Sequence, residues 1–145
     1  MDTLESLLAR EACRELVLRA AAAADANDPA ALASLFTDDA VLLRPNAEPL
    51  RGREAIRQAY AQRAPDRITR HLVSNSLVTA LSPLEASVRS LVLLWTGQGS
   101  DEAGPQGRPA HARQLVGEFD DELRLTAEGW RIARRVARFV LHTPD

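Results

Sequence analysis

The sequence predicts one α+β domain in which helices pack on one face of a curved, mainly antiparallel sheet. Residues 3–27 contain no glycine or proline and repeat apolar side chains at helical spacing, whereas residues 69–142 consist largely of alternating or β-branched runs. A chain of 145 residues with 46% hydrophobic and 26% charged residues has the size and composition of a single globular domain. We therefore expect residues 1–145 to form one folding unit.

Three helices are predicted before the sheet. The first covers residues 3–27, because Leu8, Ala12, Leu16, Ala20 and Ala23 recur at three- and four-residue steps. The second covers "PAALASLF", where the preceding aspartate caps free backbone amides and the proline fits the first helical position. The third covers "REAIRQAYAQRA" and ends before the next proline.

One short strand and four long strands are predicted. The short strand lies around residues 40–43, and the long ones cover "TRHLVSNSLVTAL", "EASVRSLVLLW", "ARQLVGEFDDELRL" and "WRIARRVARFVLH". The last segment also shows helical periodicity. A hairpin turn at "TAEG" would, however, bring Arg134 and Arg135 opposite the acidic residues 120–122, which favours a strand. The layout is a four-stranded meander curled around a cone-shaped pocket.

Composition excludes several classes of function. The chain has no lysine, which rules out Schiff-base catalysis and a phosphate-loop lysine. Its net charge of −2 and few aromatic residues argue against a nucleic-acid partner, so the arginine-rich last strand is interpreted as a paired sheet face. The single cysteine, Cys13, is expected to be a small buried residue. No secretion signal or membrane span is recognisable, which predicts a cytoplasmic protein.

Two segments of the sheet region predict features outside the pocket. Leu91, Leu93 and Trp95 alternate onto one side of a strand whose other side faces the helices. We expect this outer face to form a homodimer interface. The segment 97–110 is rich in glycine and proline and is expected to form a mobile hairpin loop.

The order of elements, with "LASLFTDDAVLL", "GREAI", "TRHLVSN" and "GWRIARR" at their positions, resembles the nuclear transport factor 2-like superfamily and its SnoaL-like branch. The resemblance extends from about Arg14 to Leu141. It implies a cystatin-like α+β fold, and it leaves the activity open because the superfamily includes dehydratases, isomerases, cyclases and non-catalytic binders. "TRHLVSN" and "GWRIARR" also resemble the β-subunits of ring-hydroxylating dioxygenases, whose role is mainly structural.

Within this superfamily the chain is similar to scytalone dehydratase, in which an aspartate near the end of the first helix orients a histidine on a strand. Asp25 and His71 match these positions, so the resemblance implies a general base and its orienting carboxylate. Two tyrosines of that enzyme are replaced, by Ala24 and by the Leu42–Leu43 pair, and its second histidine is missing. Dehydration of scytalone is therefore not expected. A structural role for His71, hydrogen-bonded without turnover, remains the alternative.

The sequence hypothesis is a cofactor-independent enzyme of the SnoaL-like kind, a lyase or isomerase that moves a proton on a small apolar carbonyl or polyketide-like compound. The alternative is a non-catalytic ligand-binding or structural subunit. No cofactor is expected, and no metal site, because metal-ligand spacings such as His-x-His are absent. We expect the pocket to be lined by Phe36, Tyr60, Val73, Asn75, Val92, Leu94, Leu115 and Phe119.

Overall fold

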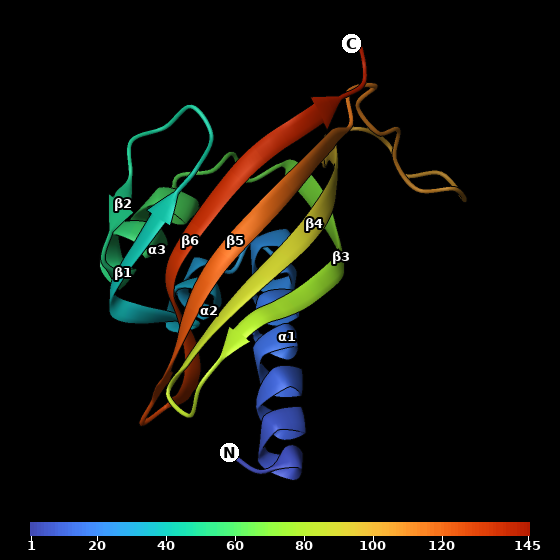
Figure 1. The fold of residues 1–145 in the computed structure, drawn as a ribbon. Coiled ribbons are helices and arrows are strands. Elements are labelled where there is room, and N and C mark those ends of the chain that lie inside the picture. Colours follow the sequence, from blue (N-terminus) through green and yellow to red (C-terminus); the bar gives the residue numbers. More distant parts are fainter.

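The computed structural model describes all residues 1–145 and confirms the α+β architecture (Figure 1). Three helices lie on one side of a curved, open sheet of six strands. The helices are α1 (Thr3–Asp25), α2 (Pro29–Ser34) and α3 (Arg53–Ala61). The strands are β1 (Phe36–Leu43), β2 (Leu50–Arg51), β3 (Arg67–Leu81), β4 (Glu85–Gln98), β5 (Leu115–Thr126) and β6 (Gly129–His142).

The strands follow the order β2-β1-β6-β5-β4-β3 across the sheet. Strands β3 to β6 form the antiparallel meander expected from the sequence, and β1 joins it parallel to β6. The two-residue strand β2 pairs with the end of β1 and was not predicted. Phe36 begins β1, although the sequence analysis assigned it to the second helix, which ends at Ser34.

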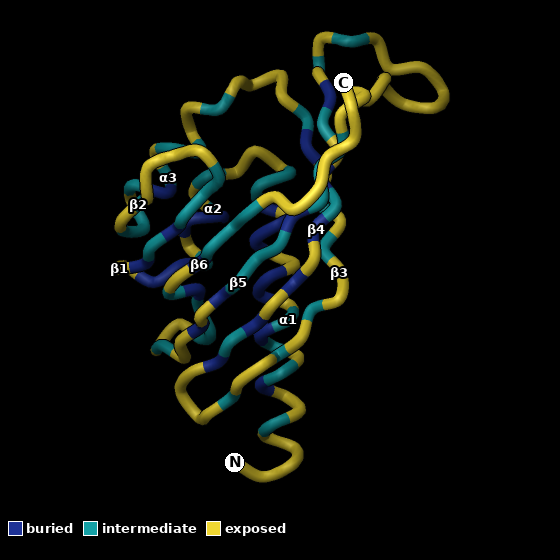
Figure 2. Tube along the Cα trace, turned by 45° about the horizontal axis from the view of Figure 1, so that its top comes forward, coloured by how far each residue is buried: buried dark blue, intermediate teal, exposed yellow.

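Helix α1 runs across the concave face of the sheet (Figure 1). Asp2 caps its N-terminus by accepting a hydrogen bond from the Glu5 amide, and the Glu5 side chain accepts one from the Asp2 amide in return. The first turns project beyond the sheet, so Leu8 is exposed despite its place in the predicted apolar stripe (Figure 2). The buried face begins at Ala9 and continues through Cys13, Leu16 and Val17 to Ala23.

The hydrophobic core lies between α1 and the meander. Phe36, Ile56 and Ile132 are fully buried in it, one each from β1, α3 and β6. Cys13 is also fully buried there, and burial raises the pKa of its thiol to about 11. The thiol is therefore protonated at neutral pH, which agrees with the structural role expected from the sequence.

The β5–β6 hairpin has the predicted charge pairing. Asp121 lies opposite Arg135, and Glu122 lies opposite Arg134. The Arg135 guanidinium donates two hydrogen bonds to the Asp121 carboxylate, at 2.7 and 3.0 Å, and both side chains are buried. This bidentate ion pair favours the observed register between β5 and β6 in the middle of the sheet.

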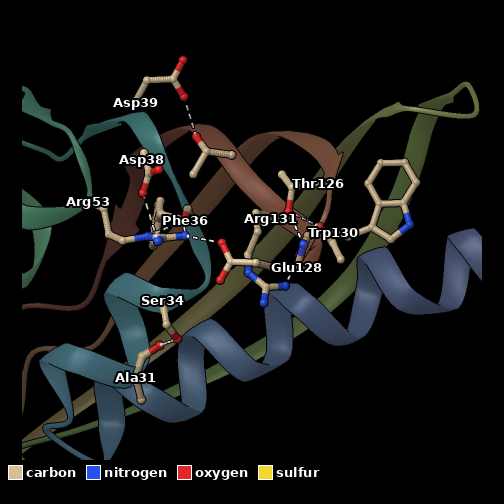
Figure 3. A network of polar contacts seen from close by, with 12 residues as sticks. Ala31, Ser34, Phe36, Asp38, Asp39, Arg53, Thr126, Glu128, Trp130 and Arg131 are labelled. Atoms are coloured by element: carbon tan, nitrogen blue, oxygen red, sulfur yellow. Dashed lines mark hydrogen bonds and ion pairs between the residues drawn. The ribbon is translucent and has the colours of Figure 1, made fainter.

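Arg53 holds the start of α3 against the sheet (Figure 3). Its guanidinium donates two hydrogen bonds to the Phe36 carbonyl oxygen, at 2.6 and 2.9 Å. It also forms ion pairs with Asp38 on β1, at 3.0 Å, and with Glu128 in the β5–β6 turn, at 3.5 Å. One side chain thus connects α3, β1 and the β5–β6 turn.

The segment between β4 and β5 extends away from the domain as an exposed loop (Figures 1 and 2). Gly104 and Gly107 pair across its tip, and Gly99 donates a hydrogen bond to the Asp66 carbonyl at its base. The structure thus contains the expected hairpin, and its mobility stays a prediction. None of the helices is both long and apolar enough to cross a membrane.

Candidate active site

Asp25 and His71 meet where the last residue of α1 reaches the first part of β3. The His71 Nδ1 atom lies 2.5 Å from one carboxylate oxygen of Asp25, and the His71 backbone amide donates to the other at 2.9 Å. The Thr69 hydroxyl donates a third hydrogen bond to the carboxylate, also at 2.9 Å. The His71 and Asp25 side chains are only 14% and 15% exposed.

The hydrogen bonds to Asp25 determine its charge. Burial alone raises the pKa of Asp25, but the hydrogen bonds from the ring and backbone of His71 and from Thr69 outweigh it, so the pKa lies below its usual value. Asp25 is therefore ionised at neutral pH and accepts hydrogen bonds only. His71 Nδ1 must then be the donor, so whenever the ring is neutral its lone pair is on Nε2.

His71 lines a cavity of about 230 Å³ between the helices and the sheet. No protein group hydrogen-bonds to its Nε2 atom. The cavity wall is mainly apolar and includes small residues of α1, namely Ala20, Ala21 and Ala24. A neutral imidazole that has a free lone pair and is backed by a carboxylate can accept a proton from a bound molecule.

Five of the eight residues expected to line the cavity do so: Phe36, Tyr60, Val92, Leu94 and Phe119. The other three expectations are corrected. Val73 lies opposite Val92 in the sheet but packs against the core. Asn75 adopts a left-handed backbone conformation at a bulge in β3 and is exposed, because the bulge interrupts the alternation of side chains. Leu115 lies beyond the cavity, in a shallow depression beside Thr96.

Several polar residues of the site were not identified from the sequence. Thr69 precedes His71 by two positions on the same strand, so strand alternation could have placed it on the same face. Arg44, Arg63 and Arg67 line the cavity from three loop or element ends. Nothing in their local sequence indicates that they come together. Asp38 and Asp39, the two acidic residues of β1, form ion pairs with Arg53 and Arg124. No three histidine, cysteine, aspartate or glutamate side chains converge to hold a metal ion.

The fold and the site define a class: small α+β proteins with helices on the concave face of an open sheet and a histidine–carboxylate pair at a pocket. The family model of the SnoaL-like domain matches residues 5–136. The chain therefore belongs to the SnoaL-like family. No curated protein matches it significantly.

Similar solved structures have the same fold. A protein provisionally named as a scytalone dehydratase, from Novosphingobium aromaticivorans, is 25% identical with a TM-score of 0.82, over 98% of this chain and 91% of that chain. A protein provisionally named as an aromatic ring hydroxylase, from the same organism, is 26% identical with a TM-score of 0.76, over 93% and 91%. The hexachlorocyclohexane dehydrochlorinase LinA type 2 is 18% identical with a TM-score of 0.81, over 99% and 93%.

Proposed function

We propose that the chain is a cofactor-independent lyase or isomerase acting on a small carbonyl compound, with His71 as the general base and Asp25 as its orienting carboxylate. The observation that carries the proposal is the 2.5 Å contact between His71 Nδ1 and Asp25, with Nε2 left free beside an apolar cavity. The names of two similar proteins support it, since dehydration and dehydrochlorination both remove a proton and a leaving group from adjacent carbons.

The proposed step begins with proton transfer. His71 Nε2 accepts a proton from a carbon next to a carbonyl group, and the C–H electron pair moves toward the carbonyl oxygen as an enolate. In an elimination, the enolate re-forms the carbonyl group, a double bond forms between the two carbons, and the leaving group departs with its bonding electron pair as hydroxide or chloride. The imidazolium then gives its proton to the hydroxide or to water. In an isomerisation, the imidazolium returns the proton to another carbon. Asp25 stabilises the imidazolium and holds the ring in the required tautomer.

Turnover of a panel of β-hydroxy and β-chloro ketones tests the proposal. His71→Gln removes the base but keeps a hydrogen-bonding side chain beside Asp25, and we expect it to lower turnover by about a hundredfold or more. Its melting temperature should fall by only a few degrees. His111→Gln is the matched control, because His111 lies in the exposed β4–β5 loop, away from the cavity. A His71→Gln variant that retains full turnover would return His71 to a structural role.

The second candidate function is a non-catalytic binding or structural subunit. The similarity to the protein provisionally named as an aromatic ring hydroxylase favours it. In that case wild-type protein binds small ketones in the cavity, and neither it nor His71→Gln turns them over. Binding measured by calorimetry alongside the turnover panel therefore separates the two functions.

A further inference from the structure

Five arginine side chains line the cavity, and they differ in whether a carboxylate of the protein neutralises them. Arg135 and Arg138, on β6, are both paired with carboxylates, Arg135 with Asp121 and Arg138 with Asp120. Arg44, Arg63 and Arg67 form another part of the wall, where β1 and α3 end and β3 begins. None of these three has a carboxylate within ion-pair distance or donates a side-chain hydrogen bond to the protein. This wall therefore carries uncompensated positive charge.

Two of these guanidinium groups are half-buried with unsatisfied donors. Arg63 Nη1 and Arg44 Nε are shielded from solvent and have no hydrogen-bond partner. A buried charged donor without an acceptor costs free energy that an ordinary surface arginine does not. Arg135, by contrast, donates two hydrogen bonds to the buried Asp121 carboxylate. Arg138 Nη1, also in the cavity lining, lacks an acceptor as well, but Arg138 is already paired with the Asp120 carboxylate. Arg63 and Arg44 are thus the lining arginines that have both an unsatisfied buried donor and no carboxylate partner.

The Tyr60 ring holds this pair of arginines in place. The Arg63 guanidinium carbon lies 4.3 Å from the ring centre, and that of Arg44 lies 5.9 Å from it. Burial lowers the pKa of Arg63, and the neighbouring charges of Arg67 and Arg44 lower it further, against the opposing effects of Tyr60 and Asp25. A bound anion would relieve the repulsion among the three guanidinium groups and accept their free hydrogen bonds.

The rest of the cavity lining indicates the chemistry of the ligand part that does not contact the arginines. Leu32, Leu42, Val92 and Leu94 provide apolar walls, and His71 lies in the same cavity. A ligand that satisfies both parts has a carboxylate at one end and an apolar body beside the histidine. Planar guanidinium groups match a carboxylate well, because they can donate two parallel hydrogen bonds to it.

We propose that Arg63, assisted by Arg44, forms a carboxylate-binding subsite, and that the substrate class is a small, mainly apolar carbonyl compound that also carries a carboxylate. Arg67, which is exposed at the rim of the cavity, adds positive charge to the entrance. This inference rests on the proposed function, since it names the substrate class of the same cavity. It is tested by binding alone, so its outcome does not depend on turnover.

Calorimetric titration with 2-naphthoate and with its uncharged analogue 2-naphthamide tests the subsite. Wild-type protein should bind the carboxylate about tenfold or more tightly than the amide, as expected for hydrogen bonds between charged groups. Arg63→Gln should remove this preference while leaving the affinity for the amide within about twofold. Arg44→Gln should reduce the preference for 2-naphthoate over 2-naphthamide. This second variant tests the subsite even if Arg63→Gln lowers the melting temperature.

Arg57→Gln is the matched control. Arg57 lies on α3 near Arg63, but it pairs with Glu54 on the exposed surface, so the change removes one charge without touching the cavity. It should retain the preference for 2-naphthoate. Equal binding of the two compounds by wild-type protein, or an undiminished preference in both Arg63→Gln and Arg44→Gln, would overturn the proposal. Binding of inorganic phosphate as tight as that of 2-naphthoate would also overturn it, because the apolar walls would then contribute nothing.

The binding test and the turnover test fail independently. Loss of carboxylate preference in Arg63→Gln together with full turnover in His71→Gln contradicts the proposed base and leaves the subsite standing. If Arg63→Gln keeps the carboxylate preference and His71→Gln loses turnover, the subsite is contradicted and the proposed base is supported.

Discussion

Asp25 shows how one side chain can organise a reactive group. Its carboxylate accepts three hydrogen bonds, from the His71 ring, the His71 amide and the Thr69 hydroxyl. At 100° per residue, Asp25 lies about 180° around the helix from Leu16, a position that is also typical of an exposed acid. The resemblance to scytalone dehydratase paired it with His71, and the structure brings the two together. Arg63 was missed, because its environment depends on Tyr60 and on two segments distant in the sequence.

Asp25→Asn should destabilise the domain at neutral pH by roughly 1–3 kcal/mol, because the amide cannot accept all three hydrogen bonds. The lowered pKa of Asp25 gives this loss a pH dependence. A carboxylate with a folded-state pKa below its unfolded-state value stabilises the fold above the unfolded-state value, about 4, and loses this contribution as the pH falls further. The stability difference between wild type and Asp25→Asn should therefore shrink between pH 5 and about pH 2, measured by urea unfolding. A difference independent of pH would contradict the role of the ionised carboxylate.

The four long strands were predictable from the alternation of apolar and polar side chains and from the pairing of opposite charges. The bulge in β3 and the bounds of β1 and β2 were not. The pairing of Arg135 with Asp121 follows from folding "WRIARRV" back at the turn, and the structure has that register. The bulge at Asn75 reverses the side-chain alternation of β3 midway, and no periodicity indicates it. Strand β2 has only two residues, too few to show a periodic pattern of side chains. Strand β1 begins earlier than expected, because the helix before it ends at Ser34.

Arg135→Met should destabilise the domain by about 3–5 kcal/mol, because it leaves the fully buried Asp121 carboxylate without its partner. The double variant Asp121→Leu with Arg135→Met removes both charges and should recover much of this loss. Urea unfolding of the two single variants and the double variant measures the coupling. A double variant whose loss equals the sum of the two single losses would show that the pair does not act as a unit.

The convex face of the sheet remains uncovered in the monomer. Leu72, Leu93, Val116 and Leu141 lie opposite one another across β3 to β6 and form an apolar row on the face away from α1. Leu72 and Leu141 are 55% and 65% exposed. The continuous "SLVLLW" strand thus has one face on the cavity and core and the other on solvent. In a dimer with a twofold axis, the same surface of both copies meets at the interface. This row could therefore pack against the identical row of a second copy.

We expect the chain to form a homodimer through this row in solution. Leu93→Arg places a charge in its middle and should give a monomer at micromolar concentration, measured by size-exclusion chromatography with light scattering. Leu84→Arg serves as the control, because Leu84 is exposed in the β3–β4 turn, outside the row. A wild-type monomer, or a dimer that Leu93→Arg leaves intact, would refute this interface.

The central claim is that His71 presents a base to the cavity, and hydrogen–deuterium exchange on carbon tests it without knowledge of the substrate. The probe is 2-tetralone, a small apolar ketone with acidic protons beside its carbonyl group. In D₂O, wild-type protein should accelerate the exchange of these protons, measured by proton NMR, and His111→Gln should do the same. His71→Gln should reduce the rate to that of buffer. Equal exchange rates for wild type and His71→Gln would contradict the account.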